Sequence, residues 1–330
     1  MPFPLLPHLA EWAPVELNGL GILTIFGDKS IGNSIGNLVH SWADWMRTFG
    51  SFVVADNQIT QSELGFAAHN ITEVSTTPNI SSWLTRWLNS FLLTHSATSI
   101  QVRLEDNPTT WCSTAPAMAL GFMTMAPLLA FATIIGDAWG TINVLAMISS
   151  VLVRQLLVHK MRCLLNDAAS SIIQEGFGSE VVKVLLVLPN SKIVTIVGPR
   201  ILIIKCMLLD TRKECSYRLK AASWAAFGVH AIALGMSSFL IQMLSLLVLG
   251  LGTFLTTTNA GANREVIGSK LRLKVDDGVP TLTRIQAYAR LGMGTAEENA
   301  MMHWGVIPHD TNRGWWDKYQ KTQQTVDPLH

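Results

Sequence analysis

Charged side chains are scarce in this sequence. Asp, Glu, Lys and Arg make up 14% of the 330 residues, whereas charged residues form about a quarter of an average soluble domain. The 24 Lys and Arg almost balance the 23 Asp and Glu, so no overall field attracts nucleic acids or acidic substrates. The composition therefore excludes a nucleic-acid-binding tail protein and a disordered chain.

Cysteine and catalytic motifs are also rare. The four Cys residues, at positions 112, 163, 206 and 215, form no Cys-x-x-Cys pair with zinc spacing. Cys206 and Cys215 could pair by position, but a reducing cytosol would keep them as thiols. A glycine-rich phosphate loop, a Gly-x-Ser-x-Gly elbow and a His-Glu-x-x-His motif are all missing. We expect no metal, no cofactor and no catalytic residue, which favours a non-enzymatic protein.

Two long apolar tracts are present instead. Residues 115–158 contain only two charged side chains, Asp137 and Arg154, and residues 221–262 contain none. As one helix the first tract would be about 66 Å long, whereas the hydrocarbon core of a bilayer is roughly 30 Å thick. We therefore expect two transmembrane helices, 116–135 and 138–158, separated by a turn that contains Asp137 between two glycines.

The second tract has a less obvious division. Its core, residues 221–257, would form a helix of about 55 Å, which is too long for one upright pass and short for two. We expect a break near residues 235–238, giving passes at 218–234 and 238–257, of which the first could be re-entrant. The alternative is one long, strongly tilted helix.

Basic residues predict the orientation. They flank both tracts and are absent from both expected turns, which places the flanks in the cytosol. The flanking residues are Arg154, Lys160 and Arg162, then Arg212, Lys213, Arg218 and Lys220, and finally Arg264, Lys270, Arg272 and Lys274. Four passes result.

The N-terminal region conflicts with this orientation. Residues 1–114 hold four Lys and Arg against nine Asp and Glu, and an acidic flank favours the outside. Asn70 and Asn79 begin candidate glycosylation sequons, which make the chain a glycoprotein only if they are luminal. An outside N-terminus would require an odd number of passes, so three and four passes both remain open.

Helices and short strands are expected outside the membrane. Trp-rich stretches at 38–49 and 81–93 have helical periodicity, and they would either lie in the membrane interface or form an ordinary core. Runs at 181–188, 193–197 and 201–209 predict a three-stranded meander. A strand at 270–275 and helices at 281–291 and 295–304 complete a small α+β domain.

The expected fold class is mainly α: a polytopic α-helical membrane protein with a small extramembrane α+β domain. We expect the protein in the plasma membrane or an endomembrane. The five expected regions are an N-terminal region with amphipathic helices (1–114), a transmembrane hairpin (115–158), an extramembrane helix and meander (159–217), the second transmembrane segment or segments (218–258) and a cytosolic C-terminal region (259–330).

Three stretches carry a resemblance. Residues 222–236, 287–292 and 314–319 read Ala-Ser-Trp-Ala-Ala-Phe-Gly-Val-His-Ala-Ile-Ala-Leu-Gly-Met, Ala-Tyr-Ala-Arg-Leu-Gly and Gly-Trp-Trp-Asp-Lys-Tyr. They resemble uncharacterised multi-pass membrane proteins of filamentous fungi. The resemblance implies a fungal membrane protein and transfers no activity or catalytic residue.

Two functions remain open. The first is a membrane scaffold that binds a protein partner through its cytosolic domain, where Trp315, Trp316 and Tyr319 are candidate contacts because aromatic residues anchor interfaces. These three side chains could equally be buried against the domain's own sheet. The second is a homo-oligomeric transporter or channel subunit, whose path would use the polar residues of the tracts. The candidate intramembrane residues are His230, Gln242, Asn143 and Asp137.

Overall fold

The computed structural model describes most of the chain. The described residues are 11, 13, 29–46, 51–90, 93, 96–105, 110–176, 180–211, 215–258, 262–275 and 283–325. They form two compact units, which we call the helical unit (residues 1–61, 107–164 and 211–264) and the sheet unit (62–106, 165–210 and 265–330). The N-terminal region of the sequence analysis is therefore divided between the two units near residue 61.

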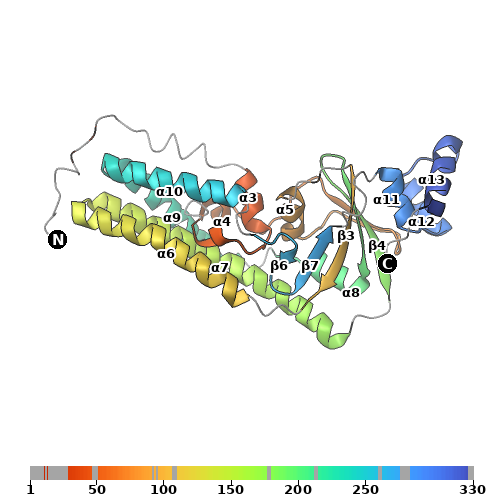
Figure 1. Ribbon diagram of the computed structural model, residues 1–330, viewed down its shortest axis with the longest axis horizontal. Coiled ribbons are helices and arrows are strands. Elements are labelled where there is room, and N and C mark those ends of the chain that lie inside the picture. The colour runs from red at the N-terminus through yellow and green to blue at the C-terminus, as the bar shows by residue number, and fades with distance from the viewer. Residues whose placement is uncertain are drawn as a thin grey trace. The chain divides into compact units, whose positions relative to one another are not determined.

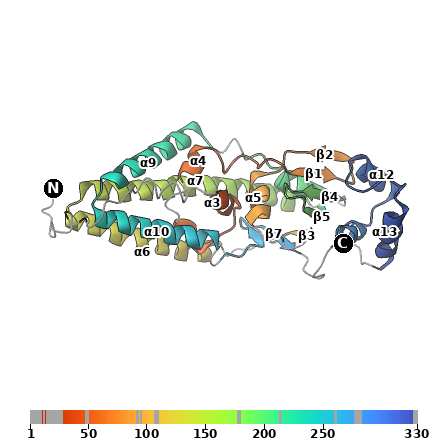
Figure 2. The ribbon, with the colours of Figure 1, turned by 90° about the horizontal axis from the view of Figure 1, so that it is seen from above.

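Four long helices dominate the helical unit (Figure 1). They are α6 (Thr110–Ile135), α7 (Ala138–Glu175), α9 (Tyr217–Met236) and α10 (Phe239–Thr257). All four are long and apolar enough to cross a membrane. Figures 1 and 2 show α6, α7 and α10 side by side, and side chains from all four helices, including Ala132, Met147, Leu234 and Ile241, form a common core.

Both expected breaks between helices are confirmed. α6 ends before Gly136, whose φ of +82° is a left-handed conformation that favours glycine. α9 and α10 are separated by Ser237 and Ser238, both of which have extended backbone with ψ near 150°. The single long helix considered for the second tract is therefore wrong.

The extramembrane helix expected after residue 158 is present, and it continues the second helix of the first tract. α7 runs without interruption to Glu175 and stops at Gly176, which has a φ of +86°. Its 38 residues correspond to about 57 Å, so a membrane would cover only part of this helix. Its last turns, from residue 165, belong to the sheet unit.

Three shorter elements complete the helical unit. They are α3 (Lys29–Gly36), the 3₁₀ helix η1 (Trp42–Trp45) and α4 (Ser51–Ala55). η1 packs closely on α6 at Gly121, where an added Cβ atom would lie 2.7 Å from the Cβ of Trp45. Of the Trp-rich stretch 38–49, Leu38 and Met46 are buried and Trp42 is 57% exposed.

The sheet unit contains a seven-stranded sheet of order β2-β1-β4-β5-β3-β7-β6. The strands are β1 (Ala67–Asn70), β2 (Ser75–Thr77), β3 (Ala97–Leu104), β4 (Val181–Val187), β5 (Ile193–Pro199), β6 (Val266–Ile267) and β7 (Leu271–Val275). β3 lies between β5, to which it is parallel, and β7, to which it is antiparallel. In this register Ile100 pairs with both Ile196 and Val275, so one strand joins segments from three distant parts of the sequence.

The expected three-stranded meander is only partly correct. β4 and β5 form the hairpin, but the third run is helical: α8 (Arg200–Leu202) leads into a π-helical turn, η2 (Ile203–Met207). β3 and β4 flank β5 on its two sides, so β5 offers no free edge to a following strand. The helical turn instead buries Leu202, Cys206 and Met207. The strand expected at 270–275 exists as β7 and pairs with β3.

Helices cover the sheet. α11 (Arg284–Arg290), α12 (Thr295–His303) and α13 (Arg313–Thr325) lie together at one end of the sheet unit (Figures 1 and 2). Their buried residues Tyr288, Met301 and Tyr319 share a core with Leu185 and Ile193 of the sheet. An ion pair of 2.9 Å between Lys183 Nζ on β4 and Glu297 Oε2 on α12 adds a polar link.

The amphipathic helix expected at 81–93 is confirmed as α5 (Ser82–Ser90). Trp83 and Trp87 are 0% and 1% exposed, and the indole Nε1 of Trp83 donates a hydrogen bond of 3.0 Å to the carbonyl oxygen of Cys206. A buried, hydrogen-bonded Trp is typical of a protein core. Of the two interpretations of this stretch, ordinary core packing is the one observed.

Replacing Trp83 tests this packing. Trp83→Ala should lower the free energy of unfolding by about 3–5 kcal/mol, because it leaves a large cavity. Trp42→Ala is the matched control and should cost less than about 1 kcal/mol, since Trp42 is more than half exposed. Chemical denaturation of the purified full chain measures both values, and equal losses would contradict the assignment of Trp83 to the core.

Candidate functional site: an arginine network beside a cavity

Asp137 joins the two helical breaks of the helical unit. Its Oδ1 accepts a hydrogen bond of 2.8 Å from the backbone N–H of Gly140, in the first turn of α7. Its Oδ2 accepts one of 2.7 Å from the N–H of Ser238, directly before α10. A carboxylate at helix N-termini satisfies unpaired N–H groups and complements the helix dipole. Asp137 therefore has a structural role at the expected turn.

The other three candidate intramembrane residues are buried separately. Asn143 on α7 donates a hydrogen bond of 2.9 Å to Ser245 Oγ on α10. Gln242 donates one of 2.9 Å to the carbonyl oxygen of Ser237. His230 is 2% exposed on α9. The structure thus assigns packing contacts to Asn143 and Gln242, and it does not join the three residues into one polar path.

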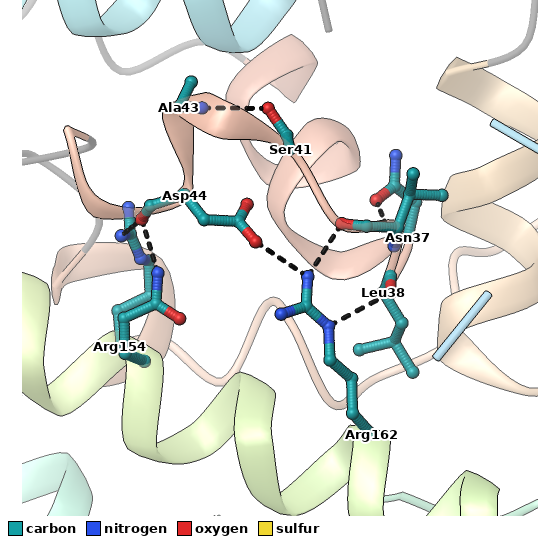
Figure 3. A network of polar contacts seen from close by, with 9 residues as sticks. Asn37, Leu38, Ser41, Ala43, Asp44, Arg154 and Arg162 are labelled. Carbon is teal, nitrogen blue, oxygen red and sulfur yellow. Dashed lines mark hydrogen bonds and ion pairs between the residues drawn. The ribbon is translucent and has the colours of Figure 1, made fainter. Parts of the chain in front are cut away.

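Two arginines of α7 form a network that the sequence analysis missed (Figure 3). Arg154 and Arg162 are 1% and 7% exposed, although Arg154 would be expected near the water interface. Arg154 Nη2 and Gln155 Nε2 both donate to the backbone carbonyl of Asp44 in η1. The arginines therefore hold the segment before α4 against α7.

Arg162 makes three hydrogen bonds within this network. Its Nε donates to the carbonyl oxygen of Leu38 at 3.1 Å, and its Nη2 donates to the carbonyl of Val39 at 2.7 Å and to Asp44 Oδ2 at 2.9 Å. Nη1 carries no hydrogen bond to the described residues, and Figure 3 shows it pointing away from Leu38. The protein therefore uses the Nε and Nη2 edge of the guanidinium.

A cavity of about 270 Å³ lies beside this network. Its polar lining comes from His40, Asp44, Gln155, His159 and Arg162, and its apolar lining includes Met118 on α6 and Leu152 on α7. A second cavity, also of about 270 Å³, is lined by apolar residues of the same two helices. Trp45, Met118 and Leu152 line both cavities, so the polar space continues into the apolar one.

The surroundings keep His40 uncharged. Burial, and next the positive charge of Arg162, lower the pKa of His40 from 6.5 to about 4, although Asp44 acts in the opposite direction. At neutral pH the imidazole is therefore neutral and can both donate and accept hydrogen bonds.

The C-terminal aromatic residues form a cluster inside the sheet unit. Tyr319 is 0% exposed and stacks on Trp315, with ring centroids 5.3 Å apart. Trp315 and Trp316 are partly buried against the same core. Burial raises the pKa of Tyr319 well above its usual range, and the nearby carboxylate of Glu298 adds to this effect. Only Trp315 and Trp316 retain surface for the partner contact that the sequence predicts.

The two sequons occupy different surroundings. Asn70 is half-buried at the end of β1, where its Nδ2 donates a hydrogen bond of 2.9 Å to Glu73 Oε2. Asn79 is exposed between β2 and α5. Both belong to the sheet unit, and their glycosylation stays a prediction.

The described residues contain no group of three or more His, Cys, Asp or Glu side chains that could hold a metal ion. Comparison with models of protein families, with curated proteins and with solved structures found no match to this chain. A function is therefore inferred from the chain's own residues.

The burial of His40 predicts a pH dependence of stability. The unfolded state binds a proton on His40 below about pH 6.5, whereas the folded state does so only near pH 4. Stability should therefore fall as the pH is lowered from 6.5 to 4, by on the order of 2–3 kcal/mol from this residue. His40→Gln should remove that part of the decline, which denaturation of the full chain at several pH values measures. An unchanged pH profile would contradict the burial of His40.

Proposed function

We propose that this chain is a four-pass integral membrane protein that acts as a non-enzymatic scaffold and presents the sheet unit on one side of the bilayer. The observation that carries the topology is that the strands of one sheet come from segments before, between and after the two helical hairpins. β1–β3 precede α6, β4 and β5 lie between α7 and α9, and β6 and β7 follow α10.

A membrane restricts how such a sheet can form. Strands joined by backbone hydrogen bonds must share one side, because a bilayer core cannot pass through an open sheet. The chain between β3 and β4, and again between β5 and β6, must then cross the membrane an even number of times. α6 with α7, and α9 with α10, supply two candidate passes each. This parity supports four passes over three.

Charge supports a cytosolic position for the sheet unit. Lys160 lies in the half of α7 that is remote from its turn, and Arg218 and Lys220 lie in the first turn of α9, at the end remote from the second turn. The turns at 136–137 and 237–238 contain no Lys or Arg. By the positive-inside rule, the turns face outward or into a lumen and the sheet unit faces the cytosol. Asn70 and Asn79 would then remain without glycans.

The scaffold role is supported by how the polar residues are used. Asn143 and Gln242 bond within the helical unit, which gives less support to the oligomeric transporter or channel. The sheet unit, with Trp315 and Trp316 at its partly exposed aromatic cluster, would bind the protein partner. The resemblance to fungal multi-pass membrane proteins agrees with the proposed membrane insertion and carries no information on the role.

Cysteine labelling tests the topology. Ser75→Cys lies on exposed β2, and Trp139→Cys lies at the start of α7 with 43% of Trp139 exposed. In sealed vesicles with the cytosolic face outward, a membrane-impermeant maleimide should label Ser75→Cys and spare Trp139→Cys, whereas vesicles of the opposite orientation should give the reverse.

The unsubstituted chain gives the background labelling of the native cysteines. Labelling of both variants from one side, or a glycosidase-sensitive mass on Asn70 or Asn79, would contradict the proposed topology.

A further inference from the structure

The two cavities beside η1 follow one face of each neighbouring helix. On α6 the lining residues are Ala117, Met118, Gly121, Phe122, Met125, Ala126 and Leu129, and on α7 they are Ile148, Val151, Leu152, Gln155, Leu156, His159 and Arg162. Steps of three and four residues keep side chains on one face of a helix. The cavities therefore form one elongated space along α6 and α7, with an apolar end and a polar end.

This space is suited in size to a single hydrocarbon chain. Each cavity has a volume of about 270 Å³, slightly below the roughly 300–1,000 Å³ of pockets that enclose drug-sized ligands. Its walls also reach the surface, because Met118, Phe122, Leu152 and Leu156 are 49%, 74%, 47% and 55% exposed. In a bilayer these exposed apolar side chains would contact lipid, so a ligand could enter sideways from the membrane.

The polar end lies at the depth of lipid headgroups. At 1.5 Å per residue along α7, His159 and Arg162 are about 32 Å and about 36 Å from Ala138, the first residue of the helix. With the turn before Ala138 at one surface of a hydrocarbon core roughly 30 Å thick, both side chains reach the opposite interface. Trp45, which lines both cavities, would lie near the boundary that Trp prefers.

The guanidinium of Arg162 provides the recognition chemistry. Its position is fixed by Leu38, Val39 and Asp44, and Nη1 has no hydrogen bond to the described residues. A positioned guanidinium N–H is a strong donor to phosphate oxygens. His159 and Gln155 line the same end, together with the Asp44 carboxylate that pairs with Arg162. Gln155 Nε2 already donates to the carbonyl oxygen of Asp44, and His159 Nε2 lies 3.5 Å from Cys163 Sγ.

From these observations we propose that the space between α6 and α7 binds a phospholipid with an anionic headgroup, whose phosphate contacts Arg162 and His159 and whose acyl chain lies between Met118 and Leu152. This site rests on the proposed membrane insertion of α6 and α7. It goes beyond the scaffold role, because it gives the helical unit its own ligand.

Lipid titration of the purified full chain tests the site. After delipidation in detergent, native mass spectrometry would count bound dioleoyl phosphatidic acid and, separately, dioleoyl phosphatidylcholine. The expected result is one phosphatidic acid per chain, bound about tenfold more tightly than phosphatidylcholine. Equal affinity for the two lipids would overturn the proposal, as would complete competition by inorganic phosphate at the same concentration as the lipid.

Two leucines of α7 provide matched variants. Leu152→Trp fills the space shared by both cavities and should abolish binding, whereas Leu145→Trp should not. Leu145 has nearly the same exposure, 49% against 47%, and lies outside the linings of both cavities. Retention of phosphatidic acid by Leu152→Trp would overturn the acyl-chain position.

A headgroup variant separates the two ends of the site. His159→Leu should weaken phosphatidic acid binding and reduce its advantage over phosphatidylcholine, since it removes a polar group from the headgroup end. Unchanged selectivity in this variant would overturn the headgroup position. Cysteine labelling reports the position of Ser75 and Trp139 independently of lipid binding. An unsubstituted chain that labels as proposed but binds the two lipids equally would therefore refute the lipid site alone.

Discussion

The hydrogen bonds that β3 makes on both of its edges organise this protein. On one edge β3 pairs in parallel with β5, and on the other it pairs with β7. Parallel neighbours require a long connection, and here that connection contains the hairpin of α6 and α7. The link from β5 to β7 contains the hairpin of α9 and α10. The sheet thus fixes where each helical hairpin begins and returns, and in the proposed topology it requires an even number of membrane crossings.

Several polar groups of the helical unit are hydrogen-bonded locally. Asp137 accepts from two helix N-termini, Asn143 reaches Ser245, and Gln242 bonds to a carbonyl of the preceding turn. In an apolar environment each unsatisfied polar group would cost several kcal/mol. Arg162 differs, because its guanidinium bonds to the protein through Nε and Nη2 and also lines a cavity with other polar groups.

Local features of the sequence were sufficient to predict the long helices but not the network of Arg154 and Arg162. Gly136 and the Ser237-Ser238 pair break helices through their own backbone preferences, so both hairpins could be predicted. The β-branched run at 201–209 became helical because β5 already has two neighbours, a fact of tertiary structure. Arg162 and Asp44 are 118 residues apart. Two opposite charges in apolar surroundings suggest a pair, but their partners and the cavity beside them depend on how η1 packs at Gly121.

The order of the strands also has a consequence for biosynthesis. β1, β2 and β3 leave the ribosome before any of the strands that flank β3, and β7 is the last of these to emerge. At a synthesis rate of 5–20 residues per second, β7 is synthesised roughly ten to thirty seconds after β3. In the proposed topology both hairpins would insert during that interval while the edge of β3 that pairs with β7 remains exposed, and exposed edges invite aggregation. In that topology correct folding of the sheet would be coupled to the timing of membrane insertion, and a chaperone that covers β3 would protect the nascent chain.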